Sequence, residues 1–161
     1  MRASEFIVEA VGNDYLYHAT QPAAMLHILD KGLLKASYRP QQATIARTNA
    51  PTISTTRSRH YAESDEFIDN LNLTYDGNAV ILVLDRPSIA NQYRMFSSSQ
   101  GTQTFGDEYE EVIVVPKGSM PVRGKIKGFY FNPNRRNTIK DYEDVPWFTR
   151  LLNSPYLLNR K

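Results

Sequence analysis

The stretch YLYHATQPAAMLHILDKG, residues 15–32, carries the clearest structural signal in the sequence. Residues 15–18 are expected to form a strand, since aromatic and apolar side chains suit a pleated surface. Thr20 is the expected N-cap of a following helix, and Pro22 suits the first turn of that helix. Gly32 is expected to end the helix. One buried stripe is predicted along it, formed by Met25, Leu26, Ile28 and Leu29.

The remaining segments predict strands and helices in an order typical of an α+β domain. Helices come early in the chain and between strands, and several strands follow them. The run at 79–84, AVILVL, is apolar throughout and predicts a central strand covered on both faces. Further strands are expected at 52–56, 93–96, 108–115 and 125–131, helices at 4–10, 58–71 and 141–153, and loops at 35–51 and 97–104.

We expect a single domain over residues 1–161, with an N-terminal helix within 1–12 and a C-terminal helical extension over 138–161. The composition, 41% hydrophobic and 22% charged residues, is typical of a globular chain. No internal repeat, heptad pattern or linker to a second domain is visible in the sequence. Pro146 is expected to break the last helix or to mark its true start.

The absence of cysteine removes several classes of chemistry. It excludes a disulfide framework, a thiolate nucleophile and a cysteine-based zinc site. With only three histidines in the chain, we expect no metal site. The net charge of +2 permits a nucleotide or nucleic-acid partner without arguing for one.

No apolar run approaches the length that spans a bilayer, so no membrane association is expected. The first seven residues, MRASEFI, lack the apolar segment of a signal peptide. We therefore expect the protein to act in a cytoplasm, either its own or that of a host.

The predicted strand at 108–115 begins with acidic residues and continues with apolar ones. Glu108, Glu110 and Glu111 lie at its start, and such like charges cost free energy unless solvent or a cation offsets them. Period-two alternation puts Glu108 and Glu110 on one face and Glu111 on the other. A carboxylate beside an apolar core suits an active site, whereas a charged gatekeeper at an exposed strand end is an equally good interpretation.

His18 closes the first strand just before the expected helix N-terminus at Thr20. Free N–H groups at a helix N-terminus favour an anion such as a diphosphate. The imidazole and the hydroxyl could then hydrogen-bond a ribose. The alternative is a half-buried histidine beside an ordinary threonine cap.

Other polar groups give weaker signals. Residues 54–57, STTR, form a hydroxyl-rich strand end followed by Tyr61, although such strands are common and this tyrosine is equally suited to the core. The remaining histidines, His27 and His60, are interpreted as structural. The basic residues Lys125, Lys127, Arg135 and Arg136 are more typical of a solvated face than of a nucleic-acid site.

Three of these segments, taken in order, resemble the motifs of ADP-ribosyltransferases. Residues 17–20, YHAT, with the helix ending at GL (32–33), resemble a Y-H-G-T opening, and residues 53–57, ISTTR, are similar to a strand that bears serine and threonine. Residues 108–114, EYEEVIV, resemble the glutamate that opens an apolar strand. The histidine places the chain closer to the His-containing branch, while the Ser-Thr-Thr stretch resembles the Arg-containing branch. The resemblance implies a split β-sheet core flanked by short helices.

Roles follow from the resemblance by position. His18 would bind the adenosine-side ribose, with Tyr17 and Thr20 beside it and the backbone of Ala19 holding the nicotinamide carboxamide. The usual glycine of the motif is replaced by this alanine, which is tolerated unless φ is positive there. Tyr61 would stack on nicotinamide. The catalytic glutamate is expected at Glu111 or, if the motif is shifted by one residue, at Glu110, with Ser54 and Thr56 supporting it. Sequence favours Glu111, directly before the apolar run.

The resemblance implies a mono-ADP-ribosyltransferase that uses NAD as substrate. ADP-ribose would pass to a macromolecular acceptor, protein or nucleic acid, and nicotinamide would be released. Tyr109 stands where arginine-modifying relatives carry a second Glu or Gln, which argues against arginine as the acceptor. The alternatives on the same fold are NAD glycohydrolysis, RNA 2′-phosphotransfer, or a catalytically inactive module that binds a nucleotide or partner.

Overall fold

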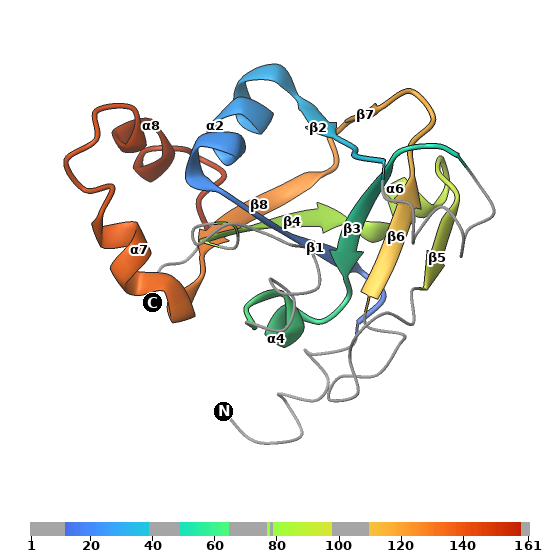
Figure 1. The fold of residues 1–161 in the computed structure, drawn as a ribbon, viewed down its shortest axis with the longest axis horizontal. Helices are drawn as coiled ribbons and strands as arrows, with labels where there is room; N and C mark the ends of the chain where they lie inside the picture. The colour runs from blue at the N-terminus through green and yellow to red at the C-terminus, as the bar shows by residue number, and fades with distance from the viewer. Residues whose placement is uncertain (1–11, 39–48, 65–76, 78, 98–109, 159–161) are drawn as a thin grey trace.

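The computed structural model describes residues 12–38, 49–64, 77, 79–97 and 110–158 (Figure 1). A six-stranded antiparallel sheet forms its centre, in the order β5-β6-β3-β1-β4-β8, and β2 and β7 form a separate pair. The α+β prediction is thereby confirmed. The strands are β1 (Tyr15–Thr20), β2 (Leu33–Lys35), β3 (Thr52–Thr56), β4 (Val80–Asp85), β5 (Met95–Ser97), β6 (Glu110–Val114), β7 (Ser119–Pro121) and β8 (Ile126–Phe131).

The large sheet is divided between β1 and β3. These two strands share one register pair, Tyr17 with Thr56, whereas β1 and β4 share six and β3 and β6 share five. The sheet therefore consists of two halves, β5-β6-β3 and β1-β4-β8, which run in different directions in Figure 1. Beyond the shared pair the backbones diverge, and a gap opens that side chains can line.

The helix α2 (Pro22–Lys31) follows β1 as predicted. Gly32 ends it with φ of 67°, and its N–H donates to the carbonyl of Ile28. The predicted N-cap at Thr20 is wrong, because Thr20 is still paired with Val80 in the β ladder and Gln21 takes the cap position. Strand pairing thus outweighs the capping preference of a threonine.

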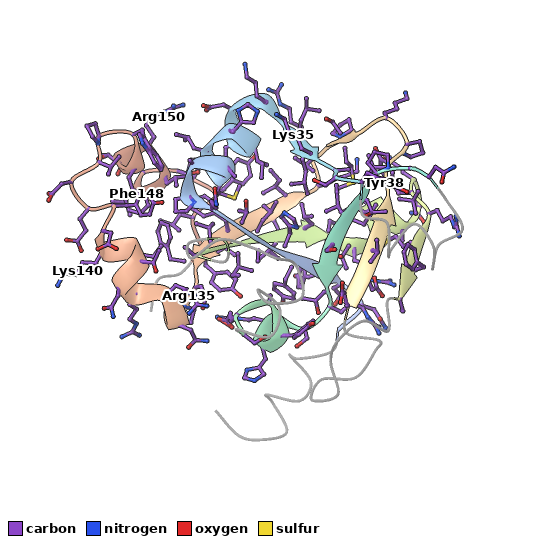
Figure 2. All side chains as sticks on the ribbon, viewed as in Figure 1. Lys35, Tyr38, Arg135, Lys140, Phe148 and Arg150 are labelled. Carbon is purple, nitrogen blue, oxygen red and sulfur yellow. The ribbon has the colours of Figure 1, made fainter. Side chains whose placement is uncertain are left out.

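Each face of the β1-β4-β8 half packs against its own cluster of side chains. One face, which we call the first face, packs against α2 and α8 (Phe148–Leu152) (Figures 1 and 2). Met25 and Phe148 of these helices lie with Leu16 of β1 in the larger cluster. The second face carries Ala19 and Val83 and packs against Tyr61 of α4 (Arg59–Ala62). Because both faces are covered, β4 is buried along its apolar length, as predicted.

The same alternation assigns faces in the β3-β6 half. Ile53 and Ile113 are register partners in the larger cluster, so they lie on the first face. Side chains of neighbouring positions along a strand point to opposite faces. The partners Thr55 and Glu111 therefore share the first face, and Thr56 and Glu110 share the second.

Several predicted elements differ from those observed. The helix expected at 141–153 is present only after Pro146, as α8, which agrees with the prediction that Pro146 marks its true start; turns that include Pro146 separate it from α7 (Arg136–Lys140). The helix expected at 58–71 ends at Ala62 as α4, and residues 65–71 lie outside the described part. The N-terminal helix and nearly all of the 97–104 loop also lie outside it. The sequence missed β2, β7, α6 (Arg86–Ala90) and the 3₁₀ turn η2 (Pro133–Arg135).

Candidate functional site

A cavity of about 210 Å³ lies in the gap between β1 and β3. The end of β1 and the start of β3 provide its opposite walls, and the first turn of α2 and the end of β2 complete it. Residues of both faces line it, because the gap passes between the two halves of the sheet. The lining residues are His18, Ala19, Thr20, Gln21, Ala24, Lys35, Ser37, Thr52, Ile53, Ser54 and Gly77.

His18 is fixed across this gap. Its Nδ1 lies 2.9 Å from the backbone carbonyl oxygen of Ser54. A carbonyl only accepts, so Nδ1 carries a proton and donates it, and in the neutral form of the ring Nε2 is then the acceptor atom. The histidine thus bridges the two halves of the sheet where the ladder between them has ended.

The lining of the cavity suits an anion. Lys35 is a cation at its rim and is labelled in Figure 2, and none of the described lining residues carries a carboxylate. Gln21 and Ala24 belong to the first turn of α2, where backbone N–H groups have no partner within the helix. Such groups, together with the helix dipole, favour negative charge. A phosphate-bearing ligand therefore matches this end of the cavity.

The two candidate glutamates are buried on opposite faces of β6, with Glu110 2% and Glu111 5% exposed. Glu111 is held by two arginines: its Oε1 lies 3.0 Å from Nε of Arg57, and Arg86 donates to both oxygens from Nε and Nη2 at 2.9 and 3.0 Å. Thr55 donates to the backbone carbonyl of Glu111 at 2.8 Å. The carboxylate of Glu111 thus forms an ion triad with two arginines.

Glu110 instead begins a row of register partners across the second face. Thr56 pairs with Glu110 on one side and with Tyr17 on the other, and Tyr17 pairs with Val83. Neighbouring strands lie about 4.8 Å apart, so the Cα atoms of Glu110 and Tyr17 are separated by about 10 Å. The row therefore connects the carboxylate with the strand that carries the YHAT motif.

Short hydrogen bonds anchor the segment between β3 and α4. The Oγ1 of Thr56 accepts from the N–H of Ser58 at 3.0 Å, and the Oγ of Ser58 accepts from the N–H of Tyr61 at 3.0 Å. Ser58 is therefore the N-cap of α4. Tyr61 itself is fully buried in the second-face cluster beside Ala19 and does not line the cavity in the gap.

A second group of titratable residues lies close to α4. Arg59 stacks on the ring of Tyr130 with its Cζ 4.8 Å from the ring centroid, and its Nε lies 3.8 Å from Glu63. Burial raises the pKa of Glu63, and the Arg59 guanidinium offsets part of that rise. Burial also raises the pKa of the Tyr130 phenol well above its usual range, so the phenol stays neutral.

The structure thus brings together four of the predicted residues, His18, Ala19, Thr20 and Ser54, at the cavity in the gap. Three others, Tyr17, Thr56 and Glu110, lie in the second-face row. Lys35, Gln21 and Arg86 were missed, since nothing in their sequence context indicates which strands become neighbours. Within the described residues, no group of His, Cys, Asp and Glu side chains could hold a metal ion.

Comparisons with protein-family models, with curated proteins and with solved structures found no match for this chain. Among the helices that the structure describes, none is long and apolar enough to cross a bilayer.

Proposed function

We propose that this chain is an NAD-dependent ADP-ribosyltransferase that transfers ADP-ribose to a macromolecular acceptor and releases nicotinamide. One observation carries the proposal. Two motifs separated by more than thirty residues, YHAT and STT, meet at one cavity in the gap between β1 and β3. Four of the residues that the motif resemblance assigns to the site, His18, Ala19, Thr20 and Ser54, line that cavity. Packing of the chain alone would not require the lining of this cavity to be polar and compatible with an anion.

The cavity suggests how the chain would hold NAD. The diphosphate would lie against the first turn of α2 with Lys35 at the rim. His18, with its Nδ1 proton committed to Ser54, would accept a ribose hydroxyl at Nε2. The remaining nicotinamide riboside would extend past Ala19 toward the second face, where Glu110 lies.

We propose Glu110, rather than Glu111, as the catalytic carboxylate. The resemblance assigns Ser54 and Thr56 to support the glutamate, and alternation places both on the face of Glu110. Glu111 would first have to leave Arg57 and Arg86, and breaking a buried ion pair costs roughly 3–5 kcal/mol.

The chemistry assigned to Glu110 is charge stabilisation. The bond between C1′ of the ribose and the nicotinamide nitrogen breaks, and its electron pair leaves with neutral nicotinamide. Positive charge develops on C1′ and the ring oxygen, as in other glycosyl transfers. A carboxylate hydrogen-bonded to the ribose hydroxyls stabilises this charge more in the transition state than in the ground state. The acceptor then attacks C1′ and loses its proton.

The activity test measures nicotinamide release and label transfer from NAD into a cell lysate. Glu110→Gln is expected to lower the rate by about a hundredfold or more, which corresponds to about 3 kcal/mol of barrier. Asp144→Asn, at an exposed carboxylate that lines none of the cavities described, is the matched control. If Glu110→Gln retains full activity, its assignment is wrong. Release without transfer indicates a glycohydrolase, and NAD binding without either indicates an inactive module.

The site test fills the cavity. Ala24 lines it from the first turn of α2, whereas its neighbour Ala23 is exposed. Ala24→Phe is expected to abolish stabilisation by NAD, and Ala23→Phe to retain it. A ligand at a hundredfold its Kd stabilises by about 2.7 kcal/mol, or about 5–11 °C in Tm for a domain of this size. Equal NAD-induced shifts in both variants would place the NAD site elsewhere.

A further inference from the structure

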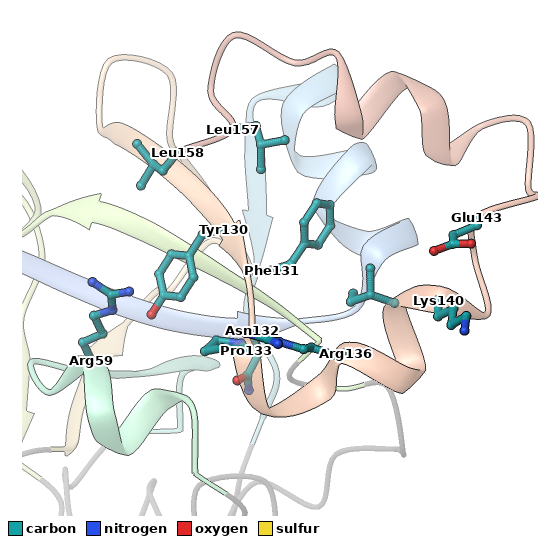
Figure 3. Close-up of a pocket in the computed structure, with 11 residues that line it drawn as sticks. Arg59, Tyr130, Phe131, Asn132, Pro133, Arg136, Lys140, Glu143, Leu157 and Leu158 are labelled. Carbon is teal, nitrogen blue, oxygen red and sulfur yellow. The ribbon is translucent and has the colours of Figure 1, made fainter. Parts of the chain in front are cut away.

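Two neighbouring cavities lie away from the gap, one on the second face of the β1-β4-β8 half and the other at its β8 edge. The first, which we call the tyrosine cavity, has a volume of about 430 Å³ and is lined by Tyr15, Tyr17, Arg59, Val83, Lys127, Tyr130 and Leu158. The second, which we call the α7 cavity, has a volume of about 270 Å³ (Figure 3). Arg59, Tyr130 and Leu158 line both cavities and form the wall between them.

The charge of this double cavity is positive. Among the described residues, Arg59 and Lys127 line the tyrosine cavity and no carboxylate does; Glu63, which lies 3.8 Å from Nε of Arg59, is not in its lining. Arg136 and Lys140 line the α7 cavity, where Glu143 is the one acidic residue in the part of the lining that the structure describes. These cations come from α4, β8 and α7, and all four are exposed. The sequence predicted a solvated face for Lys127 and Arg136, but the fold places both around a hollow.

Aromatic rings form the body of the tyrosine cavity. Tyr15 and Tyr17 stand two residues apart on β1, so they project from the same face, and Tyr15 is 44% exposed. Val83 provides an apolar floor, and its register partner Gly128 adds no side chain above it. Leu158 packs on that glycine, since a Cβ there would lie 2.5 Å from it. The cavity is therefore apolar at its base and basic at its rim.

A guanidinium over an aromatic ring completes the arrangement. Arg59 lies over the ring of Tyr130, and Figure 3 shows the two side chains beside each other. Both residues line the two cavities. Arginine in this position keeps its charge while its planar group remains able to stack or to bind phosphate. Since the Tyr130 phenol stays neutral, it adds no negative charge to the wall.

We propose that this double cavity binds single-stranded nucleic acid. Rings that accept unpaired bases, beside cations that follow the phosphates, are the features that single-strand sites combine. A base would stack in the tyrosine cavity, with its phosphates on Arg59 and Lys127, and the strand would continue toward Arg136 and Lys140. An acidic peptide would use the cations but has no use for the rings. Paired bases of a duplex cannot enter a concave cavity.

The position of the double cavity links it to the proposed reaction. Tyr17 lines the tyrosine cavity and is also part of the row that ends at Glu110, about 10 Å away across two strands. A bound strand would therefore place its bases beside the proposed catalytic carboxylate. The link between the double cavity and the reaction rests on the proposed function, whereas the binding of single-stranded nucleic acid does not. Binding is therefore measured without NAD, so that failure of one is distinguishable from failure of the other.

The experiment is fluorescence anisotropy of a labelled oligothymidine of about 12 nucleotides titrated with the full chain. Lys127→Glu with Lys140→Glu is expected to weaken binding by more than about tenfold and to lower the salt slope by about 1.4. Lys31→Glu with Lys117→Glu changes the same charge at exposed positions outside both cavities and is expected to have an effect below about twofold. Tyr15→Ala is expected to weaken binding at least about fivefold with an unchanged salt slope.

Two further probes test the class of ligand. A duplex of the same sequence and a poly-glutamate peptide are both expected to bind at least about tenfold more weakly than the single strand. Equal binding of the peptide, with no effect of Tyr15→Ala, would assign the surface to acidic proteins and overturn the proposal. The absence of oligonucleotide binding at about 50 mM salt, or equal losses in the two charge-reversal pairs, would also overturn it.

Discussion

The ion triad at Glu111 makes a prediction that separates stability from activity. Glu111→Gln removes a carboxylate whose side chain is 6% exposed and leaves Arg57 and Arg86, 16% and 26% exposed, facing each other. Removing one partner of a buried pair costs roughly 3–5 kcal/mol. Arg86 is partly solvated, so we expect the lower end, about 3 kcal/mol. For a domain of this length that corresponds to a Tm lowered by about 6–12 °C.

The assay is urea and thermal unfolding of Glu111→Gln beside Glu110→Gln. The first variant is expected to lose stability, and the second to lose transfer activity with a much smaller change in Tm. A triple variant, Arg57→Met, Glu111→Leu and Arg86→Met, is expected to recover most of the loss, since apolar residues of similar size often replace buried ion pairs without cost. If Glu111→Gln keeps its Tm within about 2 °C but loses activity, the triad is not structural and the reasoning that selects Glu110 fails.

Three further predictions concern stability. Burial raises the pKa of Glu63 in the folded state, so its contribution to stability is present below the unfolded-state pKa and is lost as pH rises through the raised value. Urea titrations should therefore show wild type losing stability relative to Glu63→Gln as pH rises above the ordinary pKa of 4.5, and a difference that is constant with pH would contradict this. Gly32→Ala should lower the free energy of unfolding in urea by about 1–2 kcal/mol, because φ is 67° and the new Cβ meets Arg123. Gly118→Ala, with φ of 81° and open space around the new Cβ, should lower it only by the cost of placing an alanine at positive φ. Gly128→Ala should displace the C-terminal segment, since its Cβ would lie 2.5 Å from Leu158 and 2.8 Å from the carbonyl oxygen of Tyr156; faster proteolysis after residue 153 is the readout, and unchanged cleavage would refute the contact.

Local patterns predicted the elements that carry their own signal. The strand at 52–56 was predicted with its observed bounds, and the helix ending at Gly32 was predicted because periodicity, proline and glycine agree there. The short β2 and β7 pair with each other across more than eighty residues, and three-residue strands have no periodicity to detect. At Thr20, two local preferences competed, and the distant partner Val80 decided between them.

The choice between Glu110 and Glu111 as the proposed catalytic carboxylate shows why the candidate site was only partly predictable. Glu110 and Glu111 differ by one residue in sequence, and a shift of one residue exchanges the faces of a strand. The sequence motif favoured Glu111 because it precedes the apolar run directly. Arg86, which donates to the carboxylate of Glu111, is 25 residues away in sequence, and only the fold brings the two side chains together. The pairing of β3 with β6 is therefore the information that the motif lacks.

The split of the sheet explains how residues on opposite faces can serve one ligand. His18 points to the first face and Ser54 to the second, and in a continuous sheet no ligand could touch both side chains. Because β1 and β3 share a single register pair, the gap beyond it opens through the sheet, and the bond from His18 Nδ1 to the Ser54 carbonyl spans that gap. A ligand in the gap can therefore contact the first face at His18 and Thr20 and reach the second face near Ala19. The second-face row then leads from Tyr17 to Glu110. The gap and the row therefore suit the ligand of the proposed reaction, whose anionic diphosphate would lie near α2 and whose leaving group would lie toward Glu110.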